Sequence, residues 1–143
     1  MTDEHEHDVP TLAVGAVVVD HDRLLLVRRG RGPAQGTWAI PGGRVRRGET
    51  LAEAVTRELL EETALEGLCG PFIGWAELFD DEDPAQHVVV LDFEVTVVGD
   101  DQPTAGDDAA EVAWVDLHEV GEQRLAPGLA EFLHDHGIIP TFT

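Results

Sequence analysis

The alternation of apolar and polar positions divides the first half of the chain into strands, turns and one long helix. Residues 11–19 and 24–27 are apolar and rich in Val and Leu, and the polar turn between them predicts a hairpin. Residues 38–40 predict a short strand that ends at the Pro-Gly-Gly of residues 41–43. Residues 50–64 contain neither Gly nor Pro and carry apolar side chains at helical spacing, which predicts the one long helix.

The second half of the chain predicts more strands and two short helices. The strands are expected over residues 68–79, 87–98 and 111–115. A short helix is expected from about Asp116, and another from Pro127 as its first residue to Gly137 as its C-terminal cap. The pattern shows no internal repeat. It predicts a disordered acidic tail over residues 1–9 and one mixed α+β domain over residues 10–143.

Three glutamates of the long helix share a side with its apolar stripe. At about 100° per residue, Glu58 and Glu62 fall inside the stripe and Glu61 flanks it. A solvated acidic surface is the alternative, but such a helix places its acids opposite the core. Clustered, partly desolvated carboxylates need a cation, and the chain contains no Lys. Oxygen ligands favour Mg²⁺, or Mn²⁺ in its place.

The loop before the helix combines glycines with a concentration of arginines. Gly43 and Gly48 allow close approach of the backbone to a ligand. Six of the nine cationic side chains lie in this part of the chain, namely Arg28, Arg29, Arg31, Arg44, Arg46 and Arg47. Their guanidinium groups suit phosphate oxygens, and we expect two or three of them to bind phosphate. A metal beside such arginines predicts phosphoryl chemistry.

Composition narrows the function classes further. The formal net charge of −20 disfavours nucleic acid and anionic membranes as partners, and it suggests adaptation to high salt. The absence of Ser and Lys excludes a serine triad and Schiff-base chemistry. Cys69 is the one cysteine, and no signal sequence or long apolar run is present, so we expect a cytoplasmic protein.

Residues 43–65 contain a sequence signature. Its fixed positions are Gly43, Glu49, Arg57-Glu58-Leu59, Glu61-Glu62 and Leu65. With U for an aliphatic residue, they match G-x5-E-x7-R-E-U-x-E-E-x-G-U, the Nudix box, so the chain resembles the Nudix family. One position departs from this pattern: Ala64 stands where the family usually has Gly, which is expected to alter the exit of the helix and not the metal cluster.

The resemblance implies an α/β/α sandwich with a mixed sheet and hydrolysis of a nucleoside diphosphate linked to another moiety. It implies that Glu58, Glu61 and Glu62 bind Mg²⁺ with the carbonyl of Gly42, and that Glu58 or Glu61 polarises the attacking water. Arg57 is expected to pair with Glu49 and brace the loop against the helix. The residues expected to hold the substrate are Arg28, Arg29, Arg44, Arg46 and Gly43.

Family members often use a further acid outside the box. Glu111 is the first candidate here, with Asp107 and Asp108 behind it, and a solvated acidic loop is the alternative for all three. The aromatic side chains considered for stacking on a base are Trp38, Phe72, Trp75 and Phe79, with Trp75 and Phe79 favoured.

The substrate is less well defined by the sequence. The chain looks most like small members that act on ADP-ribose and give AMP and ribose 5-phosphate. Two alternatives stay open: removal of pyrophosphate from nucleoside triphosphates, and a nucleotide sensor that does not cleave its ligand. A homodimer is also left open.

Overall fold

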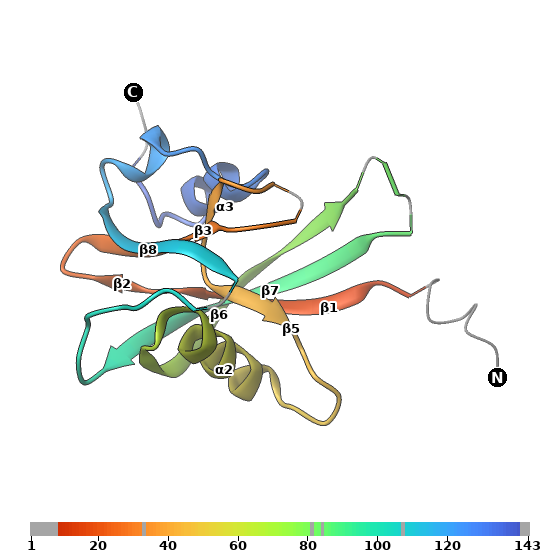
Figure 1. Ribbon diagram of the computed structural model, residues 1–143, viewed down its shortest axis with the longest axis horizontal. Helices are drawn as coiled ribbons and strands as arrows, with labels where there is room; N and C mark the ends of the chain where they lie inside the picture. Colours follow the sequence, from red (N-terminus) through yellow and green to blue (C-terminus); the bar gives the residue numbers. More distant parts are fainter. Residues whose placement is uncertain (1–8, 33, 81, 84, 107, 141–143) are drawn as a thin grey trace.

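Two α-helices lie on opposite sides of two β-sheets in the described part of the chain (Figure 1). The computed structural model describes residues 9–32, 34–80, 82–83, 85–106 and 108–140. Residues 1–8 of the expected tail, and Asp107, lie outside the described residues. The elements are β1 (Thr11–Val17), β2 (Val19–Asp20), β3 (Arg23–Arg29), β4 (Trp38–Ala39), β5 (Gly42–Arg44), α2 (Leu51–Thr63), β6 (Glu66–Phe79), β7 (His87–Val98), β8 (Ala109–Asp116), the 3-10 turn η1 (Val120–Glu122) and α3 (Leu129–Asp135).

The first sheet has the order β5-β1-β7-β6 and is mixed, because β1 runs parallel to β7 while the other neighbours are antiparallel. The second sheet joins β2, β3 and β4 in order, with β8 on β3. This architecture confirms the expected mixed sheet and α+β class.

The predicted hairpin is only partly correct. β3 pairs with the short β2, whereas β1 pairs along its whole length with β7 in the other sheet. The chain changes sheets at Val18, whose carbonyl accepts a hydrogen bond from the amide of Leu25 at 3.0 Å. An apolar run shows that a strand is buried but not which strand it joins, so local pattern could not separate the two sheets.

The Pro-Gly-Gly segment is also more regular than predicted. Gly42 and Gly43 belong to β5, which pairs antiparallel with β1. A Cβ on Gly42 would lie 2.3 Å from the carbonyl oxygen of Val14, so only glycine allows this approach of the two strands. The loop before α2 is therefore anchored to the central sheet.

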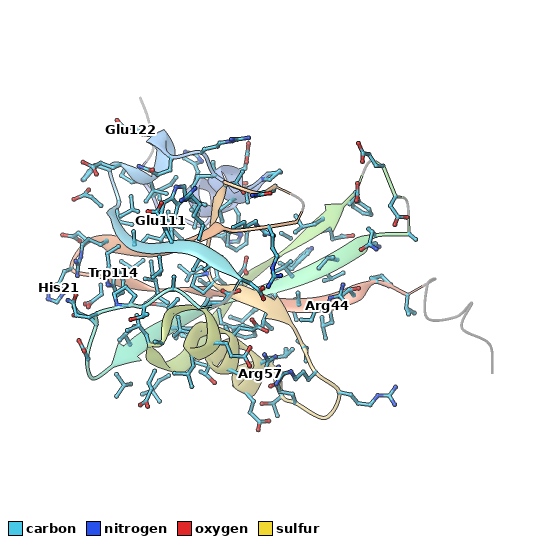
Figure 2. All side chains as sticks on the ribbon, in the orientation of Figure 1. His21, Arg44, Arg57, Glu111, Trp114 and Glu122 are labelled. Atoms are coloured by element: carbon cyan, nitrogen blue, oxygen red, sulfur yellow. The ribbon has the colours of Figure 1, made fainter. Side chains whose placement is uncertain are left out.

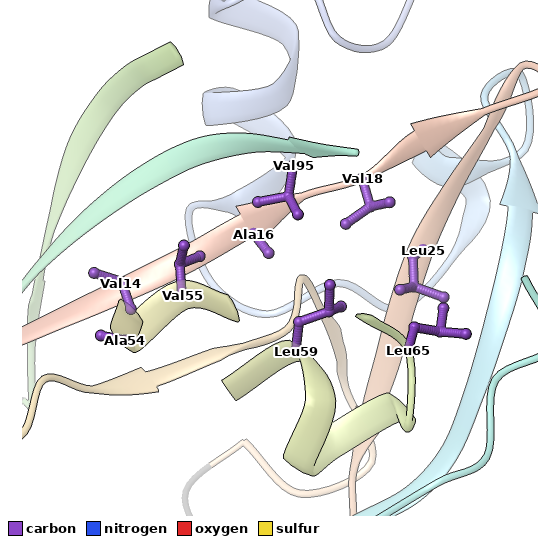
Figure 3. Close-up of a cluster of buried hydrophobic side chains, with 9 residues drawn as sticks. All are labelled: Val14, Ala16, Val18, Leu25, Ala54, Val55, Leu59, Leu65 and Val95. Carbon is purple, nitrogen blue, oxygen red and sulfur yellow. The ribbon is translucent and has the colours of Figure 1, made fainter. Parts of the chain in front are cut away.

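Helix α2 forms as predicted and covers one face of the first sheet. Thr50 and Glu53 make the expected capping box, with both hydrogen bonds present. The helix buries Ala54, Val55 and Leu59 against strand residues (Figure 3). The cluster is completed by Val14, Ala16, Val18, Leu25, Leu65 and Val95. This packing sets the rotation of α2 and hence the direction of its glutamates.

The exit of α2 carries a strained residue. Ala64 caps the helix with φ 63° and ψ 12°, in the left-handed region that favours glycine. The Ala64→Gly variant is expected to raise the free energy of unfolding by about 1 kcal/mol, since strain of this size exceeds the entropy that glycine adds to the unfolded chain. Urea denaturation measures it, with Ala52→Gly in the first helical turn as a control of opposite sign. Equal destabilisation by both variants would contradict the strain.

The C-terminal elements start later than predicted. Pro127 is not the first helical residue, because Gly128 has φ 82° and acts as the N-cap of α3. The helix ends at Asp135 with His136 as its C-cap, and Gly137 follows with φ 72°, as a glycine after a helix commonly does. The short helix expected from Asp116 is only the 3-10 turn η1. Among the described residues, no helix has the length and apolar character needed to cross a membrane.

Candidate active site

The guanidinium group of Arg57 organises the loop and the helix around it. Its Nε and Nη2 donate to Glu49 at 2.6 and 3.0 Å, so the expected pairing with Glu49 is present. Nη1 donates to Glu58 at 2.7 Å and to Glu61 at 3.1 Å. Nη2 also donates to the carbonyl of Arg44 at 3.0 Å. All five donors of the side chain are therefore used (Figure 2 labels Arg57 on α2).

Glu49 fixes the loop to this guanidinium. Besides Arg57, it accepts the backbone amide of Arg46 at 3.0 Å. The hydrogen bonds from Arg57 and then Arg46 lower the pKa of Glu49 to about 2. Glu49 thus stays ionised at neutral pH, and the loop remains attached to α2.

The carboxylate of Glu58 packs against Gly43, the second glycine of β5. A Cβ on Gly43 would lie 2.5 Å from the carboxyl carbon of Glu58 and 2.6 Å from both of its oxygens. Gly43 therefore makes room for this carboxylate. Any larger residue in place of Gly43 would displace the carboxylate of Glu58 from its position against β5.

Glu62 is held by the backbone at the start of β5. One of its oxygens accepts the amide of Gly42 at 3.0 Å. Burial raises the pKa of Glu62 to about 7, although the hydrogen bond from Gly42 acts in the opposite direction. The sequence predicted a role for the carbonyl of Gly42, whereas the contact seen here is made by its N–H group.

The donor set around Arg57 fits a hard divalent cation. Glu58, Glu61 and Glu62 offer only oxygen atoms, and the partly buried Glu62 has no cationic side chain bonded to it among the described residues. Their oxygens do not all lie within 4.8 Å of one another, since Arg57 contacts Glu58 and Glu61 while Gly42 holds Glu62. Side-chain rotations would have to bring them together.

A different acidic group does meet that distance. Among the described residues, only Asp20, His21 and Asp101 have ligand atoms that all lie within 4.8 Å. This group joins the β2–β3 turn to the loop after β7, and its His21 lies far from Arg57 (Figure 2). A guanidinium nitrogen of Arg23 lies 3.7 Å from a carboxylate oxygen of Asp101. The group is outside the predicted site and shares no residue with the box.

A cavity of about 370 Å³ opens beside the box, between the first sheet, β4 and α3. Gly42 and Gly43 line it together with Arg29 and Arg44, two of the arginines expected to bind phosphate. A second cavity, of about 360 Å³, shares Arg29 and Gly42 and is also lined by Glu62. The two cavities are therefore lined by three cationic side chains, those of Arg29, Arg31 and Arg44, and the second also by the carboxylate of Glu62. This size suits a nucleotide-like ligand.

Other predicted residues lie elsewhere. Arg28 and Glu111 face each other across β3 and β8, form an ion pair, and line neither cavity. Arg46 bonds to Glu61 at 3.3 Å, so it contacts the carboxylate cluster and not a cavity. Asp108 was the second choice after Glu111 as the further acid, and it lines the second cavity with Glu62. It is the better-placed further acid.

The aromatic candidates also differ from expectation. Trp38, Phe72, Trp75 and Phe79 do not line either cavity. Trp75 and Phe79 are instead 63% and 65% exposed on the edge strand β6. Phe132 of α3 is the aromatic side chain that lines the first cavity. Its apolar helical spacing was indistinguishable in the sequence from that of a core residue.

Asp92 is the residue that sequence analysis missed. It lies in an apolar stretch of β7, is 4% exposed and lines the first cavity. One signal could have revealed it. Asp92 is a charged residue at a position where the alternation of the strand requires an inward side chain.

Comparison with known proteins defines the family. A family model described as the NUDIX domain matches residues 9–136. An ADP-ribose pyrophosphatase of Methanocaldococcus jannaschii is 38% identical over 111 residues, which cover 78% of this chain but only 64% of that protein. The structure also resembles a NUDIX hydrolase from Nitrosomonas europaea, with a TM-score of 0.78 and 25% identity over 90% of this chain and 89% of the other. For the MutT protein from Methanosarcina mazei Go1, the TM-score is 0.77 at 28% identity, over 90% and 94% of the two chains. The chain belongs to the Nudix family of hydrolases.

Proposed function

We propose that this protein is a divalent-metal-dependent pyrophosphohydrolase that cleaves ADP-ribose to AMP and ribose 5-phosphate. The observation that carries the proposal is a pair of cavities that share Arg29 and Gly42. Arg44 and Gly43 line the first of them, and Glu62 lines the second. Similarity to an ADP-ribose pyrophosphatase favours ADP-ribose over other linked nucleoside diphosphates.

The metal-binding residues in this proposal are Glu58, Glu61 and Glu62, with Mg²⁺ as the favoured ion and Mn²⁺ as its substitute. When bound, such an ion neutralises charge on the diphosphate and lowers the pKa of water. Arg29 and Arg44 bind the diphosphate oxygens by charge-assisted hydrogen bonds. Arg57 and Glu49 position the glutamates and do not touch the substrate. Asp108, beside Glu62, is proposed to assist proton transfer in place of Glu111.

The setting proposed for this activity is a cytoplasm with a high salt concentration. The net charge of −20 without any Lys supports it, because salt screens the repulsion among acidic side chains. Small nucleotides are the proposed substrates, and neither nucleic acid nor membrane is proposed as a partner.

Product analysis tests the proposal. The pure protein is incubated in high salt with ADP-ribose or nucleoside triphosphates, with Mg²⁺ or with a chelator. AMP and ribose 5-phosphate are expected from ADP-ribose only in the presence of the metal. Pyrophosphate release from triphosphates with ADP-ribose left intact would overturn the substrate assignment, and ligand binding without any turnover would overturn the enzymatic one.

A further inference from the structure

The carboxylate of Asp92 is buried without a hydrogen-bonding partner. It is 4% exposed, and its Oδ1 has no partner among the described residues. Burial raises the pKa of Asp92 to about 6. A polar atom that is desolvated and unpaired destabilises the fold, so native proteins seldom retain one without a function.

The backbone makes room for this side chain. Asp92 on β7 lies opposite Gly15 on β1, and a Cβ on Gly15 would come within 2.1 Å of Oδ1. Glycine in the interior of a strand weakens the strand, yet here it is what allows the carboxylate to occupy this space. The two residues together form a built feature of the sheet.

Asp92 also faces the first cavity, which Arg29 and Arg44 line. Val88, Val90 and Asp92 lie at alternate positions of β7, and all three line the cavity with Gly15. The next residues of β7, Phe93 and Val95, pack on the opposite face under α2. Asp92 is therefore the buried acid of this largely apolar wall, while Arg29 and Arg44 carry the positive charge of the same cavity.

We propose that Asp92 is a specificity-determining residue that accepts a hydrogen bond from an N–H or O–H group of the nucleoside part of the substrate. This inference rests on the proposed function for the identity of the ligand. Phosphate oxygens are acceptors and go to the arginines, whereas the carboxylate needs a donor. In an adenosine moiety the donors are the exocyclic amino group of the base and the hydroxyl groups of the ribose.

Binding of product nucleotides tests the proposal without requiring turnover. Calorimetry measures the Kd of AMP, IMP, 2′-deoxy-AMP and 3′-deoxy-AMP for the wild type, for Asp92→Asn and for Glu77→Gln. Glu77 is the control, because it lines the same cavity but is exposed and bonds to His87. Asp92→Asn keeps an acceptor oxygen but loses the charge, so it is expected to weaken AMP binding about 5- to 10-fold, the difference between a charge-assisted and a neutral hydrogen bond. Glu77→Gln is expected to change AMP binding little.

The analogues identify the donor. If the amino group is bound, IMP binds the wild type more weakly than AMP does, and Asp92→Asn weakens the binding of AMP but not that of IMP. If a ribose hydroxyl is bound, 2′-deoxy-AMP or 3′-deoxy-AMP behaves in this way instead. Equal losses for all four ligands, or no loss of AMP binding, would overturn the proposal.

Stability separates this role from a structural one. Asp92→Asn removes a buried charge, so the Tm of the ligand-free protein is expected to rise, by roughly 5 °C. A fall in Tm together with uniform loss of binding would show that Asp92 supports the fold and does not select the ligand. Because these measurements use product nucleotides, they remain informative if ADP-ribose is not hydrolysed.

Discussion

Replacing Glu62 by Gln is expected to lower kcat by about 10²- to 10³-fold while leaving the fold intact. Glu62 is the one box glutamate bound to the backbone of β5, through the amide of Gly42 at 3.0 Å. Gln keeps the volume and can still accept this hydrogen bond, but it removes the charge proposed to bind the metal. The loss is of the size seen when one electrostatic contact to developing charge is removed.

Steady-state kinetics with saturating Mg²⁺ and circular dichroism together measure this effect. Glu66→Gln is the matched control, because Glu66 is an exposed acid just beyond the same helix. Near-normal turnover of Glu62→Gln at saturating metal would remove Glu62 from the proposed metal site. A loss of ellipticity would assign it a structural role instead.

Replacing Arg57 by Lys is expected to lower kcat about 10- to 100-fold, as loss of a residue that orients metal ligands commonly does. An ammonium group has three donors and no planar fork, so it cannot serve Glu49, Glu58, Glu61 and the carbonyl of Arg44 together. The pKa of Arg57 is raised by Glu49 and, to a smaller extent, by Glu58, so the guanidinium is cationic at any working pH.

The readouts are kcat, KM and Tm for Arg57→Lys, Glu49→Gln and the double variant. Arg47→Lys is the control, since Arg47 is an exposed arginine of the same loop. If Arg57 acts through Glu49, the two single effects are not additive and KM for ADP-ribose changes less than kcat. Full additivity, or an effect no larger than that of Arg47→Lys, would contradict a positioning role.

The local elements were predictable where neighbouring residues decide them. The capping box of Thr50 and Glu53 and the long helix follow from spacing within a few residues, and both are present. The strands over residues 87–98 and, within a few residues, 68–79 also formed as expected. The predicted start of α3 was wrong. It took Pro127 as the first helical residue, but Gly128 has a left-handed conformation and the helix begins only after it.

The candidate site was predictable to the extent that it lies in one continuous segment. The spacing of Glu49, Arg57, Glu58 and Glu61 through one loop and one helix is enough to bring them together, and the hydrogen bonds show that contact. The residues outside this segment were harder to place. Arg28 and Glu111 were considered separately in the sequence, but the register of β3 and β8 pairs them with each other.

By itself the sequence determined the family signature, the α2 helix and the cluster of carboxylates around Arg57, because contacts between near neighbours obey helix and loop geometry. Only the tertiary structure decided which arginines line the cavities, that Asp108 and not Glu111 lines a cavity with Glu62, and that Asp92 faces the first cavity. These outcomes depend on strand order and register between distant segments. A single residue of register reverses the face to which a side chain points, and no local pattern of apolar residues specifies it.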